Sequence, residues 1–180
     1  MNSTKKFDYF EDDSMQAISL NYAKDNLKAL IILPKNKTGI NNYIKIFSSE
    51  KYHIIINNLI NKKVILSLPK FEINFSAELS LNFQSLGMKQ AITSSADFSA
   101  MRKEKDIYIS SIIHKTFIKV DEKVNEAAAA TAVVMRVMCA FPPESVPIMK
   151  VDHQFLFIIG NIDLPHRNDM IFISKIESLL

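Results

Sequence analysis

The 180-residue sequence holds one cysteine, Cys139, only three glycines and no tryptophan. A single cysteine excludes an internal disulfide and a cysteine-rich zinc site. Three glycines are too few for a glycine-rich phosphate-binding loop, and the four histidines show no metal-binding spacing such as HExxH. No serine lies in a GxSxG motif. The sequence therefore predicts no metal, no cofactor and no enzymatic activity.

Long apolar runs and strong local charge are also absent. No segment approaches the length of about 20 apolar residues that a membrane span needs, so no membrane partner is expected. The net charge of +3 comes from scattered lysines, and the densest cluster, at residues 102–105, contains Glu104, so no nucleic-acid partner is expected. The first 15 residues, MNSTKKFDYFEDDSM, lack the apolar core of a signal peptide, which taken alone favours a cytosolic product.

Apolar periodicity predicts an α+β fold with mainly antiparallel sheets and about three helices. Two helical stripes run from Ile40 to Phe47 and from Tyr52 to Ile60, the second after a capping signal at Ser48. A third helix is expected through Leu86, with Ser76 as its cap and Gly87 as its stop. Strands are expected at Met15–Tyr22, Leu27–Leu33, Val64–Leu68, Phe71–Phe75, Ile107–Val120, Val151–Ile159 and Met170–Ile176.

The most unusual stretch is Asp121–Cys139, which reads DEKVNEAAAATAVVMRVMC and follows the predicted strand Ile107–Val120. Alanine favours helices over strands, yet no amphipathic stripe follows the four alanines. One interpretation is a short surface helix with Asn125 as its N-cap and Glu126 in its first turn. The other is a segment of small side chains that slips between strands.

Four stretches carry a resemblance to a known family. Ile112–Met135 closely resembles the strand, hinge and reactive-centre loop of the serpin family of serine-protease inhibitors. Val151–Phe157 (VDHQFLF) and Ala96–Ser99 (ADFS) are similar to two further family stretches in the expected order, and Val64–Gly87 resembles a serpin pattern of strand, proline, strand, helix and glycine. Serpin domains are about twice this length. The resemblance therefore implies that residues 1–180 form the C-terminal half of a serpin domain, with the N-terminal half of the fold missing.

The resemblance implies inhibition by a suicide-substrate mechanism. A serpin presents its loop as bait, the protease serine forms an acyl-enzyme, and the cleaved loop inserts into the main sheet. The hinge and the exposed reactive-centre loop would lie at 121–146. The hinge residues would be Glu122, Lys123, Val124, Asn125, Glu126, Ala127, Ala128, Ala129, Ala130 and Thr131.

The family's usual spacing from Glu122 places the reactive bond at Met138–Cys139. Methionine there suits a serine protease of chymotrypsin or elastase type. The alternative is Arg136, which suits a trypsin-like protease.

Four residues are expected to have structural roles. His114 shares a strand face with Thr116, so we expect a hydrogen-bonded core histidine, and the resemblance implies that it helps hold the main sheet closed. Asp152, His153 and Phe155 belong to the similar C-terminal stretch.

Departures from the family pattern keep alternatives open. Val124 stands where inhibitory serpins usually carry glycine, and its branched side chain restricts hinge rotation. Asn125 replaces a threonine or serine, and Gln154 replaces a proline. Insertion also needs a strand from the missing half, so this chain alone is not expected to trap a protease. The alternatives are a non-inhibitory serpin-like binding or chaperone protein, and a truncated fragment that self-associates through exposed strand edges. The family implies an extracellular location, with an intracellular one still open.

Overall fold

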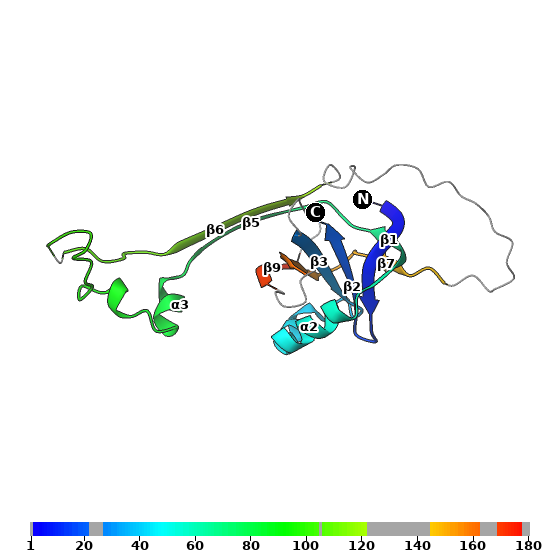
Figure 1. The fold of residues 1–180 in the computed structure, drawn as a ribbon, viewed down its shortest axis with the longest axis horizontal. Helices are drawn as coiled ribbons and strands as arrows, with labels where there is room; N and C mark the ends of the chain where they lie inside the picture. Colours follow the sequence, from blue (N-terminus) through cyan, green and yellow to red (C-terminus); the bar gives the residue numbers. More distant parts are fainter. Residues whose placement is uncertain (1, 22–26, 105, 122–144, 163–168, 178–180) are drawn as a thin grey trace, which may run out of the picture. The chain divides into compact units, whose positions relative to one another are not determined.

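A computed structural model describes residues 2–21, 27–104, 106–121, 145–162 and 169–177 (Figure 1). The chain divides into two compact units, the first made of Met1–Phe71 and Val120–Leu180 and the second of Glu72–Lys119. The described elements, in chain order, are β1 (Asn2–Glu11), β2 (Met15–Asn21), β3 (Leu27–Pro34), α1 (Ile40–Ile46), α2 (Ser49–Asn57), β4 (Ile60–Ser67), β5 (Phe71–Glu78), α3 (Ser80–Ser85), the 3₁₀ helix η1 (Gln90–Ile92), β6 (Ile113–Val120), β7 (Ile148–Lys150), β8 (Phe155–Asn161) and β9 (Asp169–Ile176).

The first unit is built on a seven-stranded sheet in the order β7-β4-β1-β2-β3-β8-β9. Neighbouring strands are antiparallel, except that β7 runs parallel to β4. The predicted α+β class with mainly antiparallel strands is therefore confirmed. None of the described helices is long and apolar enough to cross a membrane.

The core of this unit lies between one face of the sheet and the helices α1 and α2. Strands β3 and β8 are short continuous apolar runs, as expected of strands covered on both faces. The predicted cap of α2 is confirmed, since Ser48 Oγ accepts a hydrogen bond of 3.2 Å from the backbone N–H of Lys51. The helix ends at Asn57, so the predicted stripe was too long: Ile60 begins β4 and is 67% exposed. The residues of this core are Met15, Ala17, Leu30, Ile32, Ile40, Tyr43, Tyr52, Ile55, Ile56, Leu156 and Ile158.

Strand β1 is an element that the sequence analysis missed. It lies inside the sheet, between β4 and β2. Phe7 and Tyr9 are buried on one face, whereas Lys6 and Asp8 lie on the other. The alternation of apolar and polar residues over KFDYF is the sequence signal that indicates such a strand.

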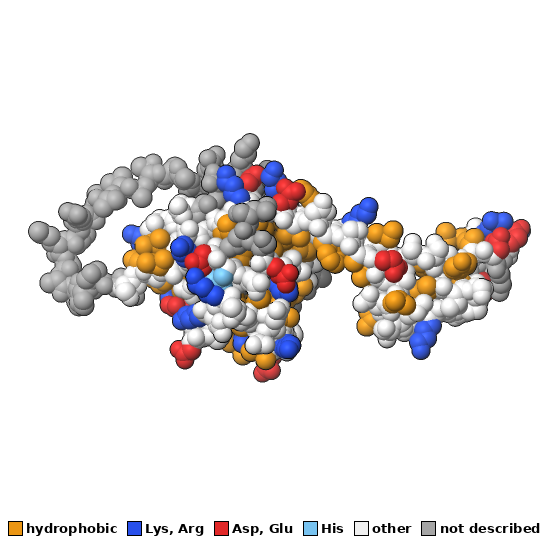
Figure 2. Space-filling view, turned by 180° about the vertical axis from the view of Figure 1, so that it is seen from behind, with side chains coloured by type: hydrophobic (Ala, Val, Ile, Leu, Met, Phe, Trp, Pro, Cys, Tyr) orange, Lys and Arg blue, Asp and Glu red, His pale blue; other side chains and the backbone are white. Residues whose placement is uncertain are grey.

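The second unit contains a two-stranded sheet of β5 and β6. Strand β6 begins at Ile113, six residues later than predicted. The backbone of Ile112 instead bonds to the corner after β5: its N–H donates to Ser80 Oγ at 3.0 Å, and its carbonyl accepts from Leu79 N–H at 2.8 Å. Figure 2 shows apolar side chains on the surface of this unit. Leu81 and Leu86 of this unit are 71% and 84% exposed.

Helix α3 begins at Ser80, so the prediction of Ser76 as its cap was wrong. Ser76 lies within β5, which continues to Glu78. The Glu78 carboxylate accepts hydrogen bonds from the backbone N–H of Ser80, at 3.0 Å, and from its hydroxyl. The predicted stop is confirmed, because Gly87 has φ of 104°, a conformation that glycine adopts without strain.

Candidate functional site

The predicted hinge and reactive bond lie outside the described residues. This holds for the hinge Glu122–Thr131 and for Arg136, Met138 and Cys139. The structure does describe both flanks of the segment: β6, which ends at Val120, and the residues from Ser145 onward that lead into β7. These flanks and their contacts are the described part of the candidate site.

The C-terminal flank is held against the edge of the large sheet. Strand β7 pairs with β4 over three residues only, with Ile65 opposite Ile148. Met149 is completely buried, and Val151 just beyond the strand is 3% exposed. Two backbone hydrogen bonds lie at the two ends of this pairing. The N–H of Ile65 donates to the carbonyl oxygen of Pro147 at 2.9 Å, and the N–H of Val151 donates to the carbonyl oxygen of Ser67 at 2.8 Å. The flank is therefore fixed although the strand is short.

A side chain from β2 adds a further bond to this flank. Gln16 Nε2 donates to the carbonyl oxygen of Ile148 at 3.0 Å and to the hydroxyl of Tyr9 at 2.7 Å. Tyr9 is fully buried, and this burial raises the pKa of its hydroxyl. The sequence analysis missed Gln16, because 132 positions separate it from Ile148, and two strands, β4 and β1, lie between theirs in the sheet order.

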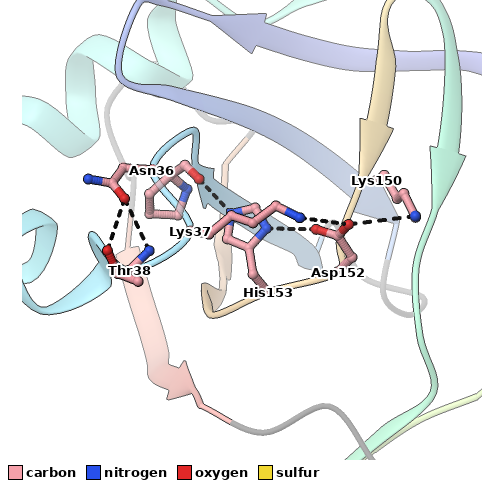
Figure 3. Close-up of polar contacts among 7 residues, drawn as sticks. Asn36, Lys37, Thr38, Lys150, Asp152 and His153 are labelled. Atoms are coloured by element: carbon pink, nitrogen blue, oxygen red, sulfur yellow. Dashed lines mark hydrogen bonds and ion pairs between the residues drawn. The ribbon is translucent and has the colours of Figure 1, made fainter.

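The residues after β7 form a polar cluster at the end of β3 (Figure 3). His153 Nδ1 lies 2.8 Å from Asp152 Oδ1, and its Nε2 lies 2.6 Å from the carbonyl oxygen of Pro34. Asp152 also pairs with Lys37 at 3.4 Å and Lys150 at 3.6 Å. The hydrogen bond to His153 and the two ammonium groups lower the pKa of Asp152 to about 2. The cluster ties β3, the turn after it and β7 to the chain just before β8.

Phe155 belongs to an aromatic group whose central ring is Phe71. The Phe155 side chain is fully buried. Its ring meets that of Phe71 edge to face, with 5.4 Å between centroids, and Phe71 also meets Phe157 at 5.2 Å. The expected structural role of Phe155 stays a prediction that mutation can test.

His114 does not lie in a core, so the expected burial was wrong. The side chain is exposed on β6. In the described part of the chain β6 pairs only with β5, so its other edge has no neighbouring strand there. The histidine does have a hydrogen-bond partner, Thr116 Oγ1 at 2.9 Å from Nε2, and its ring lies 6.4 Å from that of Phe75. The described residues also contain no group of three or more His, Cys, Asp or Glu side chains that could hold a metal ion.

Comparison with known proteins identifies the family. Residues 1–178 match the family described as Serpin (serine protease inhibitor). The leukocyte elastase inhibitor of Xenopus laevis is 35% identical over 158 residues, which cover 85% of this chain and 41% of that protein. Intracellular coagulation inhibitor 2 of Tachypleus tridentatus is 31% identical over 163 residues, covering 89% and 40%.

A solved structure agrees with these sequence relatives. The crystal structure of tengpin, a thermophilic serpin in its native state, superposes with a TM-score of 0.72 and 31% identity, over 99% of this chain and 46% of tengpin. The chain belongs to the serpin family. It spans less than half the length of the relatives it matches.

Membership places the chain in a family of protease inhibitors, as the resemblance implied, and not among enzymes. One relative is named an elastase inhibitor and another an intracellular inhibitor. The family therefore includes a protein named as intracellular, and an extracellular location of this chain stays a prediction.

Proposed function

We propose that this chain is the C-terminal part of a serpin that inhibits a serine protease as a suicide substrate. Residues 121–146 would form the hinge and the reactive-centre loop of that partial domain. The observation that carries the proposal is the family match over residues 1–178, which spans this segment. The anchored C-terminal flank supports it, because a bait loop needs an end that stays fixed while a protease engages its centre.

The proposed chemistry follows acyl transfer. The serine oxygen of the protease attacks the carbonyl carbon of Met138 and forms an ester, and the bond to the nitrogen of Cys139 breaks. The protease histidine takes the proton of the serine and passes it to the leaving amine. An apolar pocket of chymotrypsin or elastase type accepts Met138, whereas cleavage after Arg136 would indicate a trypsin-like protease.

The small hinge side chains suit the step that follows cleavage. Ala127–Ala130 offer little bulk to resist insertion as a strand between other strands. An inserted strand needs partners on both sides, and the second unit supplies a sheet of only two strands in the described part of the chain. We therefore expect trapping from a serpin of the relatives' length, and cleavage without trapping from the 180-residue chain alone.

The test is incubation with chymotrypsin, elastase and trypsin, followed by a denaturing gel and intact-mass measurement. We expect a released peptide that begins at Cys139, or at Val137 if Arg136 is the bait. Met138→Asp should abolish the chymotrypsin cut at that bond, whereas the matched variant Met135→Asp should keep it. Cuts by all three proteases only outside residues 121–146 would overturn the proposal.

Val124 favours a second candidate, a non-inhibitory serpin-like protein that binds a ligand or assists folding. A branched side chain at the hinge restricts the backbone rotation that insertion requires. In a serpin of the relatives' length that carries this hinge, cleavage without a covalent protease adduct would support the candidate. An adduct that survives denaturation would exclude it.

Exposed apolar side chains on strands favour a third candidate, a truncated product that self-associates. On β9, the edge strand of the large sheet, Ile171 is 64% and Ile173 46% exposed. On β6, Ile113 and Phe117 are each 62% exposed. An open edge with apolar side chains pairs readily with another chain. Sizing over a range of concentrations should show growing assemblies that Ile171→Lys reduces; a monomer throughout would contradict this candidate.

A further inference from the structure

Two lysines meet on one face of the neighbouring strands β1 and β4, and we call Lys6 and Lys63 the lysine patch. Lys6 and Lys63 are direct partners in the antiparallel register, and both side chains are exposed. Like charges placed directly opposite each other destabilise a strand pair. On the other face of the sheet, Lys62 Nζ lies 4.7 Å from the ring centroid of Tyr9 and Lys5 Nζ lies 5.2 Å from that of Phe7.

The charge of the lysine patch is not neutralised within the described part of the chain. No ion pair there involves Lys6 or Lys63. The next residue on the same face of β1 is Asp8, whose carboxylate is already engaged by Lys28 at 3.0 Å and by Asn61 at 2.9 Å. Burial by itself would raise the pKa of Asp8, but the hydrogen bonds from Asn61 and Lys28 lower it below its ordinary value. The charge of Asp8 is therefore already paired with Lys28. The two ammonium groups of the lysine patch are therefore available to an acidic partner outside the described part of the chain.

The register places this surface beside the exit of the proposed reactive loop. Ile65 pairs with Ile148 in a parallel ladder, so stepping back two residues along both strands brings Lys63 level with Val146. Val146 is the last residue of the proposed loop. Met138 lies eight residues earlier, and an extended chain of eight residues spans at most about 28 Å. A protease domain is at least about 30 Å across, so a protease bound at Met138 is large enough to reach the lysine patch.

We propose that the lysine patch is a docking surface for an acidic region next to the active site of the target protease. The inference rests on the proposed function, because it assumes that a protease engages the loop. Complementary charge at the rim of an interface speeds association and loses its effect as salt rises. Nucleic acid is a poorer fit, since Phe7 and Tyr9 are buried and the patch offers no exposed ring for a base to stack on.

The experiment measures binding without the acylation step. The active-site serine of chymotrypsin is converted to dehydroalanine, which cannot be acylated but leaves the pocket for Met138 open, and half of the preparation is succinylated to make its surface acidic. The affinity of the 180-residue chain for both forms is measured by fluorescence anisotropy at low and high salt. We expect the chain to bind the succinylated form about fivefold or more tightly than the unmodified form at low salt, and equally at high salt. The variant Lys6→Gln/Lys63→Gln should lose this preference.

The matched control is Lys45→Gln/Lys89→Gln, which removes the same charge from exposed positions on α1 and beside η1. It should keep the preference of the unaltered chain. An equal loss in both double variants would mean that only net charge acts, and would overturn the proposal. So would a Lys6- and Lys63-dependent affinity for dextran sulfate without any preference for the acidic protease. Failure of the active proteases to cut the loop is a separate result, which bears on the proposed function alone.

Discussion

His153 Nε2 lies 2.6 Å from the carbonyl oxygen of Pro34, so a residue just before β8 is bonded to the last residue of β3. The first prediction concerns this bond. His153→Ala should lower the free energy of unfolding by about 1–3 kcal/mol, because it leaves a part-buried carbonyl without its donor. Urea unfolding measures the change. Lys37→Ala is the control: its side chain is 70% exposed, and it should change stability by less than about 1 kcal/mol. Equal effects of both substitutions would contradict the prediction.

The second prediction concerns acid stability. Asp152 has a pKa of about 2 in the folded chain, below the ordinary value of 3.8, because His153 and two lysines stabilise its charged form. A lowered carboxylate pKa contributes stability above the ordinary value, and this contribution is lost as pH falls from about 4 towards 2. The denaturation midpoint of the unaltered chain should therefore fall more steeply over this interval than that of Asp152→Asn.

The exposed Asp13 provides the matched control for this pH series. Asp13→Asn should reproduce the acid profile of the unaltered chain, since the substitution leaves the cluster around His153 intact. Profiles of Asp152→Asn and Asp13→Asn that coincide between pH 4 and pH 2 would show that the cluster makes no contribution.

The third prediction concerns the C-terminal flank of the proposed loop. Gln16→Ala removes the bond to Ile148 and should let β7 open more often, at a cost of about 1 kcal/mol. Amide exchange of Ile65 and Val151, whose N–H groups bond across this pairing, should then speed up by roughly fivefold. The amide of Ile18, in the pairing of β2 with β3, is the internal reference and should not change. Unchanged exchange at Ile65 would show that Gln16 does not hold β7.

Much of this fold could be predicted because local chemistry and tertiary packing agree. The run LKALIILP is covered on both faces in β3, and Ser48 caps α2 as its side chain predicts. The misses come from long-range competition. The alternation from Ile107 predicts a strand that starts there. In the structure the backbone N–H and carbonyl of Ile112 are hydrogen-bonded to Ser80 and Leu79, just after β5, so strand pairing begins only at Ile113.

In the candidate site, too, residues with a local sequence signal could be predicted and residues joined by long-range contacts could not. The resemblance pointed to Asp152 and His153 because they are adjacent in a distinctive stretch, and the structure brings them to Pro34 and Lys37. Gln16 gave no comparable signal, since a lone glutamine in an alternating strand is typical of an exposed face. The pairing of Lys6 with Lys63 needs the β1–β4 register, which no local pattern predicts.

The fourth prediction concerns the aromatic contact between Phe71 and Phe155. Phe155 is fully buried and Phe71 is 6% exposed. Phe155→Ala should lower the free energy of unfolding by about 3–5 kcal/mol, the usual cost of removing a large core side chain. Phe75→Ala, at a ring that is 50% exposed, is the matched control and should cost less than about 1.5 kcal/mol.

A double-mutant cycle separates the ring contact from burial in general. Phe71→Leu, Phe155→Leu and the double variant keep apolar volume while removing the edge-to-face geometry, in which the ring planes meet at 77°. We expect a coupling free energy of about 0.5–1.5 kcal/mol between the two rings, measured by urea unfolding of the four proteins. Strictly additive effects would mean that Phe155 acts by filling space alone, and that its contact with Phe71 adds nothing specific to how β8 packs within the first unit.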